Sequence, residues 1–354
     1  MKKTLIALAV AALASSAANA TVVYQKDGTK IDIDGRVHFE LQNIKNQRTD
    51  LRDVGSRLRV RAYQDLTDRI SAYGGVELRF SNDNEIGGNF RTHRLYGGFI
   101  HKDVGTLTFG SQLHLGDHIP KANYTYEWGG NVFFDGHKKA ATFMSVPFSG
   151  VRVAADYYFG NSKKDNGTSS GTTAWNEGQG YGVGLFYDGK LADDVAVRFG
   201  SGYTEVTQST DGTKVHEYKL QRAGVGFDIT YQKVHLGFDW AYGKATKGYE
   251  SANIGFQKIA NSGGPFHKNN RFLVGLKVDV TPQNAVYGEY YFGKGEKADS
   301  RIADVKMNGW MVGADHRFNK FVAVYVEGGT GKVKQDGKEL LKNHRVLTGV
   351  RILF

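Results

Sequence analysis

The sequence predicts an all-β protein, a transmembrane antiparallel β-barrel of about sixteen strands. Apolar and polar residues alternate with a period of two along almost the whole chain, which is the pattern of strands with one buried face. Several segments keep this alternation for ten residues or more, the length that a tilted membrane strand needs. Short turns and long polar loops also alternate along the chain, as they do in outer-membrane barrels. A soluble β-sandwich would explain the alternation, but neither the strand length nor the uneven loops.

Residues 30–41 show the alternation most clearly. One parity holds Ile31, Ile33, Val37, Phe39 and Leu41, and the other holds Asp32, Asp34, Arg36, His38 and Glu40. Because successive side chains of a strand point to opposite faces, this strand has one apolar and one ionisable face. A sheet that spans lipid must close so that all its backbone groups are hydrogen-bonded. Side chains do not fill the interior of about sixteen strands, so we expect the ionisable face to line a water-filled lumen.

The same pattern predicts each strand in chain order. The segments lie near residues 30–41, 56–65, 69–80, 92–101, 105–111, 140–147, 151–159, 180–188, 194–204, 216–229, 233–243, 270–280, 285–292, 306–318, 321–328 and 343–354. The short turns are 65–68, 101–105, 147–150, 188–194, 230–233, 281–284 and 318–320, and the long loops include 111–139, 160–179 and 244–269. Aromatic residues gather near several strand ends, where they suit the girdles at the bilayer surfaces.

The N-terminus has the pattern of a secretory signal peptide. Two lysines precede a short apolar stretch that ends in the small-residue sequence ANA. Cleavage after this sequence assigns residues 1–20 to the signal peptide and 21–354 to a single barrel domain, and it lowers the formal charge from +10 to +8 because the two lysines are lost. The chain contains no cysteine, so no disulfide framework supports the exported protein.

Motifs for other kinds of chemistry are weak. His114, Asp117 and His118 stand at metal-like spacing, but no further ligand accompanies them, so no metal site is predicted. Gly295 follows Lys294 where a phosphate-binding loop needs Ser or Thr, and no G-x-S-x-G elbow marks a hydrolase. Basic residues are spread along strands rather than clustered, which argues against nucleic-acid binding by an exported chain. We therefore expect no cofactor, no nucleic-acid partner and no enzyme activity.

Several longer stretches resemble a known family. They are the mature start TVVYQKDGTKIDIDGR (21–36), SRLRVRAYQDLTDRISAYGGVELRF (56–80), THRLYGGFIHKDVGTLTFG (92–110), the loop element EWGG (127–130) and the end GVRILF, which closes on Phe354. Over essentially its whole length the chain resembles the trimeric general diffusion porins of Gram-negative outer membranes, the OmpC/OmpF-like family. The start and the terminal aromatic residue are specific to these porins in combination.

The resemblance implies a homotrimer of sixteen-stranded barrels in which the third extracellular loop, 111–139, folds inward and narrows the pore. In the family, basic residues of the barrel wall face acidic residues of this loop. By motif position the implied basic wall is Arg36, Arg57 and Arg94, with Arg59 and Arg61 in the same row. On the loop, Glu127 matches one of the family's acids, and the further candidate residues of this loop are Asp117, Asn123, His137 and Lys138. Phe354 is implied as the C-terminal assembly signal.

Two departures from the family bear on selectivity. Asn123 stands where the family commonly has a second loop acid, and His137 and Lys138 stand near the position of a further wall arginine. Since both changes weaken the acidic half of the constriction, we expect a channel for small hydrophilic solutes and ions that is non-selective or weakly anion-preferring. Its expected surroundings are outer-membrane lipid and lipopolysaccharide. The open alternatives are a barrel enzyme such as a lipase or protease, a substrate-specific sugar channel, and a secreted β-rich adhesin.

Overall fold

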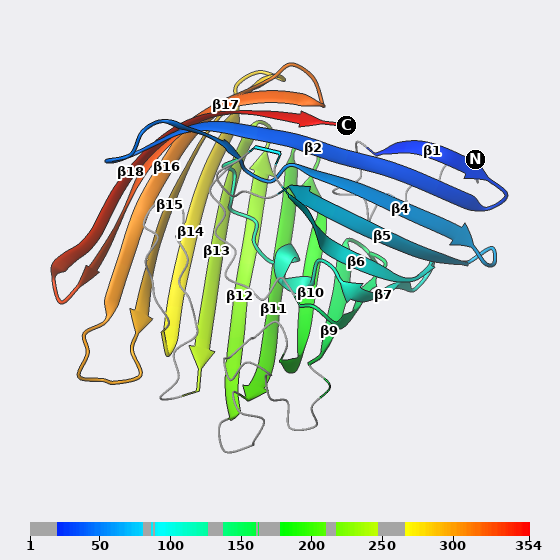
Figure 1. The fold of residues 1–354 in the computed structure, drawn as a ribbon, viewed down its shortest axis with the longest axis horizontal. Helices are drawn as coiled ribbons and strands as arrows, with labels where there is room; N and C mark the ends of the chain where they lie inside the picture. The colour runs from blue at the N-terminus through cyan, green and yellow to red at the C-terminus, as the bar shows by residue number, and fades with distance from the viewer. Residues whose placement is uncertain are drawn as a thin grey trace.

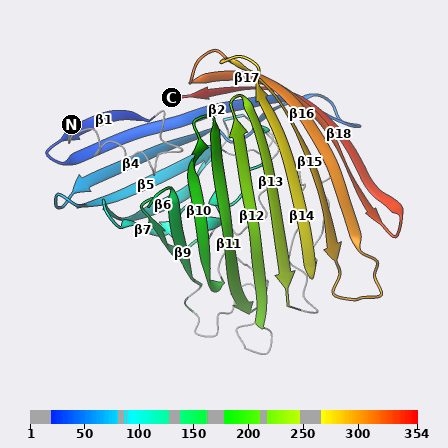
Figure 2. The same ribbon diagram turned by 180° about the vertical axis from the view of Figure 1, so that it is seen from behind.

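A computed structural model of the chain describes residues 20–80, 86–87, 89–126, 137–160, 162, 178–209, 217–246 and 266–354. Within these residues, sixteen strands form one antiparallel ring, because each pairs with two neighbours and β18 pairs back to β2. Figures 1 and 2 show these strands curving round into a cylinder. The predicted all-β barrel of about sixteen strands is therefore confirmed.

The ring strands overlap the predicted segments one for one. They are β2 (Thr29–Ile44), β4 (Arg57–Asp65), β5 (Ile70–Phe80), β6 (Phe90–His101), β7 (Gly105–Ser111), β8 (Ala140–Ser145), β9 (Val151–Phe159), β10 (Gln179–Ala192), β11 (Val195–Ser209), β12 (Glu217–Tyr231), β13 (Val234–Ala245), β14 (Lys268–Asp279), β15 (Asn284–Glu296), β16 (Val305–Arg317), β17 (Val322–Gln335) and β18 (Lys338–Leu353). The strand predicted at 321–328 is longer than expected, since β17 continues through polar residues that still pair with β18.

Two further strands were not predicted. β1 (Thr21–Lys26) forms a hairpin with the start of β2, and β3 (Asp50–Asp53) pairs with a later part of β2. Both are short, and β3 has the sequence DLRD, which contains a single apolar residue. A period of two does not show in so few residues. Among the described residues, no helix has the length and apolar character needed to cross a bilayer.

The two parities of the ring strands have opposite surroundings. On one parity, large apolar side chains are about half exposed, as for Leu236 (47%) and Val312 (53%). On the other, charged side chains are almost fully buried, as for Asp239 (8% exposed) and Glu289 (4% exposed). A water-soluble protein shows the reverse distribution, with charged residues outside. The apolar parity is therefore the lipid-facing outer face, and the charged parity is the inner face.

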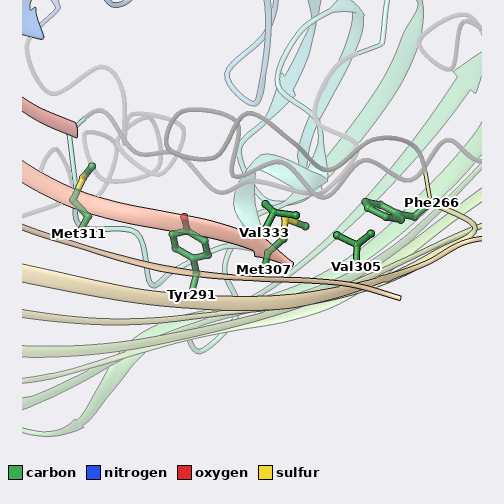
Figure 3. Close-up of a cluster of buried hydrophobic side chains, with 6 residues drawn as sticks. All are labelled: Phe266, Tyr291, Val305, Met307, Met311 and Val333. Carbon is green, nitrogen blue, oxygen red and sulfur yellow. The ribbon is translucent and has the colours of Figure 1, made fainter. Parts of the chain in front are cut away.

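One region of the inner face is apolar, contrary to the ionisable face expected throughout. Figure 3 shows this cluster, which consists of Phe266, Tyr291, Val305, Met307, Met311 and Val333. Its members on β16 share their parity with Asp315, and Tyr291 on β15 shares its parity with Glu289. These side chains cover one another from water, so that part of the inner face is held by packing rather than by hydration.

The seam of the ring joins the two ends of the chain. β2 pairs with β4 through its first half and with β18 through its second half. The terminal residue extends this ladder, since the Gly35 N–H donates to the Phe354 carbonyl (2.8 Å) and the Phe354 N–H donates to the Gly35 carbonyl (3.1 Å). The Phe354 ring lies over residue 35, where an added Cβ would stand 2.3 Å from its Cζ atom. Glycine at this position thus leaves room for the terminal ring.

Replacing Gly35 by alanine is expected to weaken the seam. The new Cβ would also stand 2.7 Å from the backbone oxygen of Arg57, so the strand as well as the ring must shift, at a cost of about 1–3 kcal/mol. The temperature at which the folded band is lost on unboiled SDS gels measures this effect. Gly328→Ala is the matched control, because its nearest heavy atoms would lie 3.8 Å away. Equal midpoints for the two variants would contradict the role of Gly35.

Candidate functional site

A cluster of arginines lies on the inner face of β2, β4, β5 and β6. Arg36, Arg57 and Arg79 follow one another directly across the strands, and Arg94 stands opposite Glu77. Glu77 contacts Arg79 at 2.6 Å, Arg94 at 2.7 Å and Arg57 at 3.6 Å. Like charges directly opposite one another destabilise a sheet, so this carboxylate holds the cluster together. Three of these guanidinium groups contact the carboxylate of Glu77, and Arg36 stands opposite Arg57, so the four arginines and one glutamate of the arginine cluster have a formal charge of +3.

Arg36 is held by a backbone group rather than by the carboxylate of Glu77. Its Nε atom donates a hydrogen bond of 2.8 Å to the carbonyl of Gly55. Gly55 has a φ of +119°, which is a backbone conformation that favours glycine, and an added Cβ there would stand 2.8 Å from the Arg36 guanidinium. The loop between β3 and β4 therefore positions this arginine through a backbone group rather than through a counter-charge.

Arg59 and Arg61 are placed differently from the other predicted wall arginines. Each stands directly opposite an aspartate of β2 in the register, Asp34 and Asp32 respectively. Arg59 contacts Asp34 at 2.5 Å, and Arg61 contacts Asp32 at 2.7 Å and Asp34 at 2.6 Å. These two arginines and two aspartates form a neutral group. It adds little to the positive charge of the arginine cluster beside it.

The segment that follows β7 is bound to the inner face through its backbone. It contains the short 3-10 helix η1 (Leu115–His118) and is described as far as Tyr126. Four carboxylates accept its N–H groups: Asp156 on β9 from Leu115, Asp239 on β13 from Lys121 and Ala122, Glu289 on β15 from Tyr124 and Thr125, and Glu327 on β17 from Tyr126. Since an irregular segment has no strand partner, these acids satisfy backbone donors that would otherwise be unpaired.

The side chain of Tyr126 extends these contacts toward the seam. Its ring stacks on Tyr325 of β17, with the ring centres 4.2 Å apart and the planes at 11°. The guanidinium of Arg351 on β18 lies 4.4 Å from the centre of the Tyr126 ring, within the range of a cation–π contact. The segment from Leu115 to Tyr126 therefore crosses inner-face residues from β9 to β18. β18 is the ring neighbour of β2, where the arginine cluster begins.

Lys121 carries a half-buried positive charge in this segment. Its Nζ atom donates to the carbonyl of His118, and it lies 6.0 Å from the ring centre of Phe186. Burial lowers the pKa of Lys121 to about 8, with Asp188 acting to raise it and Arg198 to lower it. This lysine thus changes its charge at mildly alkaline pH, far below the usual range for its residue type.

The remaining predicted loop residues have several environments. Asn123 is exposed, and its Oδ1 atom accepts hydrogen bonds from the N–H (3.1 Å) and the hydroxyl (3.0 Å) of Thr125. Asp117 is half-buried in η1. Glu127 lies outside the described residues.

His137 and Lys138 lie at the far end of the predicted loop, just before β8. His137 is buried, with Nε2 2.8 Å from the carbonyl of Gly178 and its ring stacked on Tyr158 at 5.1 Å. Lys138 follows it in a bend. His114, from the metal-like spacing, is also buried and packs edge-on against Tyr158. In the part of the chain that the structure describes, no group of three or more His, Cys, Asp or Glu side chains could hold a metal ion.

Sequence reasoning missed six residues that organise this site. They are Glu77, Arg79, Asp156, Asp239, Glu289 and Glu327. Their parity places all six on the inner face, so the alternation alone could have listed them as candidates. Choosing among many inner-face acids requires the register of neighbouring strands, which a period of two does not contain.

Comparisons with known proteins agree with this geometry. A profile of the family described as Gram-negative porin matches residues 7–336. The "Major outer membrane protein" of Pasteurella multocida strain Pm70 is 34% identical over 376 residues, covering 100% of both chains. A second protein of that name from Pasteurella multocida is 33% identical over 380 residues, again covering 100% of both chains.

Solved structures with the same fold have lower identity. An anion-selective porin from Comamonas acidovorans is 16% identical with a TM-score of 0.67, covering 92% of this chain and 100% of its own. OmpF of Salmonella typhi, in a complex with daunomycin, is 15% identical with a TM-score of 0.63, covering 94% and 100%. OmpT of Vibrio cholerae is 15% identical with a TM-score of 0.69, covering 94% and 100%. At these identities the likeness shows the fold alone.

The family match spans most of the chain, and the two relatives cover all of it at more than 30% identity. Together with the closed sheet and its apolar outer face, this makes the protein an outer-membrane β-barrel that provides a diffusion channel. The chain belongs to the Gram-negative porin family.

Proposed function

We propose that this channel passes small hydrophilic solutes and ions by passive diffusion and is non-selective or weakly anion-preferring. The observation that carries the proposal is the arginine cluster, whose formal charge of +3 lies on the inner face. A unit charge acting over about 5 Å of water is worth about 0.8 kcal/mol, and salt at about 0.1 M screens it beyond about 10 Å. Charges of this size bias ion traffic a few-fold but do not form a strict filter.

We infer that residues 111–139 are the third extracellular loop and that this loop folds inward to narrow the lumen. In support, the described part of the segment is bound by inner-face carboxylates on β9, β13, β15 and β17. Tyr126 then reaches Arg351 on β18, close to the start of the arginine cluster. The free passage on this proposal runs between the segment and the arginines of β2, β4, β5 and β6.

The predicted wall residues contribute unequally on this proposal. Arg36, Arg57 and Arg94 belong to the cluster with excess positive charge, whereas Arg59 and Arg61 are offset by two aspartates. On the loop side, Glu127, Asp117, Asn123, His137 and Lys138 remain the proposed residues. Buried His137 serves there to hold the loop end against its neighbours rather than to meet solutes.

We propose that the chain has no enzyme activity and needs no cofactor. Membership of a porin family supports this, as does the use of the buried wall acids as acceptors for backbone N–H groups of the loop segment. Purified protein that hydrolysed lipid or peptide without conducting ions would favour the barrel-enzyme alternative. If one sugar blocked the conductance, and the block saturated as the sugar concentration rose, the result would favour a substrate-specific channel.

We also propose the processing and assembly that the porin family implies. Residues 1–20 are the signal peptide, 21–354 form the single barrel domain, Phe354 is the assembly signal, and three copies form a trimer. The match of the family over most of the chain supports this, and one solved structure of the similar OmpT from Vibrio cholerae is described as a trimer form.

We propose that lipopolysaccharide binds a row of lysines on the outer face, at the edge of the barrel with the long loops. The directly opposed pairs are Lys244 with Lys268, Lys294 with Lys306, Lys306 with Lys334, and Lys332 with Lys342; we call them the lysine belt. Two acids offset part of this charge, since Glu296 lies 3.3 Å from Lys294 and 3.9 Å from Lys268, and Asp304 lies 2.7 Å from Lys294. Opposed like charges cost free energy, which phosphate groups between them would relieve.

Aromatic side chains support the position of the belt relative to the membrane. Phe272 and Phe292 stand opposite one another in the register and stack with their ring centres 4.8 Å apart. Phe292 lies two residues from Lys294 along β15, on the side toward the membrane centre. Trp310, further along β16, is 45% exposed on the outer face. Aromatic girdles of this kind mark the headgroup level of outer-membrane barrels, so the lysine belt lies where lipid phosphates are found.

The combined variant Lys306→Gln, Lys332→Gln and Lys334→Gln tests the lysine belt. Because each lysine near an anionic surface is worth about 1 kcal/mol, we expect the affinity of the purified protein for immobilised lipopolysaccharide to fall at least about ten-fold. The matched control, Lys190→Gln, Lys233→Gln and Lys320→Gln, removes the same charge near the opposite edge of the barrel. An equal loss of affinity in the two variants would refute a specific site on the belt.

The selectivity proposal is tested by single-channel recording in a planar bilayer under a KCl gradient. Glu77→Gln raises the formal charge of the arginine cluster by one and is expected to move the reversal potential toward anions. Arg36→Gln lowers this formal charge by one and is expected to move the reversal potential toward cations. The expected change in the permeability ratio is up to about four-fold.

The control for these variants removes one charge of each sign. Asp32→Asn combined with Arg61→Gln takes both partners out of an ion pair of 2.7 Å, so the net charge of the wall is unchanged. We expect its reversal potential to match that of the unchanged protein. A strong cation preference of the unchanged protein, or no shift in either cluster variant, would show that the arginine cluster does not set selectivity.

Lys121 gives the channel a predicted pH dependence. Below pH 8 its amine is charged, and as pH rises through the pKa of about 8 the positive charge is lost. Raising the pH from about 6 to 9.5 is therefore expected to move the reversal potential toward cations. Lys121→Met should show the alkaline value at both pH values, and Lys121→Arg, which stays charged, should show the acid value. A pH response that persists in both variants would assign the effect to other groups.

A further inference from the structure

Four glycines of the inner face lie directly under the backbone of the loop segment. They are Gly200 on β11, Gly226 on β12, Gly237 on β13 and Gly275 on β14. An added Cβ would stand 2.8 Å from the His118 oxygen at Gly200, 2.3 Å from the Ile119 oxygen at Gly226, 2.5 Å from Ala122 Cα at Gly237 and 2.1 Å from the Ala122 oxygen at Gly275. All four contacts are with backbone atoms, so no flexible side chain can move aside to make room.

These glycines form two rows across the strands, and each row ends in an acid. Gly200 pairs with Gly226, and Gly226 pairs with Asp239. Gly237 pairs with Gly275, and Gly275 pairs with Glu289. We call these two sets, each of two glycines and one acid, the seating rows.

The acids of the seating rows accept the N–H groups of the same part of the segment. Asp239 accepts from Lys121 (2.6 Å) and Ala122 (3.0 Å). Glu289 accepts from Tyr124 and from Thr125 (3.0 Å). In each row the backbone of the loop segment lies against two glycines. The N–H groups that follow then donate to the acid next to those glycines in the register. The second row begins on β13 two residues from the acid of the first, so the rows follow the segment as it crosses the wall.

Glycine weakens a strand, and within a sheet it marks a place where another backbone comes close. Four such positions under a stretch of seven residues, from His118 to Tyr124, meet that description. Side chains at these positions would hold the segment away from the wall. The acids alone would still offer acceptors, but the N–H groups would no longer be within hydrogen-bond distance of them.

We propose that the seating rows determine how closely the loop segment approaches the wall, and thereby how wide a passage remains for solutes. The four glycines are then positioning residues for permeation, with Asp239 and Glu289 as their fixed anchors. The inference rests on the proposed function only in its second half, that is, in the link from the position of the segment to the width of the passage. A bulkier residue in either row pushes the segment off β11–β14 toward the arginine cluster.

A thiol probe tests the first half without any measurement of conduction. The chain has no cysteine, and Ala122 is fully buried (0% exposed) against the second row. In an Ala122→Cys protein, a water-soluble methanethiosulfonate is expected to react slowly. Adding Gly226→Ala or Gly275→Ala is expected to raise the labelling rate about ten-fold or more, because the displaced segment opens more often.

Gly328→Ala is the matched control for the labelling experiment, since an added Cβ there meets only atoms 3.8 Å away. Retention of a compact band on unboiled SDS gels shows that each variant has folded. Equal labelling rates in the control and in the seating-row variants would overturn the proposal. This readout stands even if the unchanged protein does not conduct, so failure of the proposed function and failure of the seating rows are distinguishable.

Single-channel conductance tests the second half. Gly226→Ala combined with Gly275→Ala is expected to lower the conductance, because the segment moves into the passage. Asp239→Ala removes an anchor without adding bulk, so it is expected to speed the labelling of an Ala122→Cys protein. A double-glycine variant that labels faster but conducts as the unchanged protein does would refute the control of pore width by these rows.

Discussion

The closure of the sheet is the constraint on which the rest of this structure depends. In lipid, each backbone N–H and C=O must find its partner inside the protein, and an open sheet edge leaves a row of them unpaired. Here the ring closes where β2 meets β18, and Phe354 extends that ladder by two hydrogen bonds with Gly35. Because the ring is closed, each strand has one face toward lipid and one toward the interior. Apolar and polar residues alternate along the chain because successive side chains of a strand meet these two surroundings in turn.

The inner face uses its acids in two distinct ways. On the β5 side, Glu77 sits among arginines whose charges it partly offsets. From β9 to β17, acids such as Asp239 and Glu289 instead accept backbone N–H groups of the segment after β7. The difference follows from the neighbours, since arginines surround the first acid and glycines lie beside the others. One part of the interior thus keeps a net positive charge, while the acids of the other part are taken up by the loop segment.

Much of the architecture followed from the sequence with simple reasoning. The sixteen ring strands, the closed barrel and the apolar outer face were predicted from periodicity and from the contrast between short turns and long loops, and they are confirmed. The short strands β1 and β3 were not predicted, because six and four residues do not establish a period. The apolar cluster around Met307 and Tyr291 was also not predicted, since inner-face residues were assumed to meet water. For the site, the parity of Arg36, Arg57 and Arg94 was read from the pattern and the motifs, but their partners were not.

What the sequence determined by itself is the face of the sheet on which each strand residue lies, because a period of two is a local property of the backbone. The tertiary structure alone decided which inner-face residues meet. Register places Arg59 and Arg61 opposite aspartates, gathers Arg57, Arg79 and Arg94 around Glu77, and aligns pairs of glycines with the acids that bind the loop segment. Register depends on how separate strands align with one another around the whole ring. No single segment contains that information.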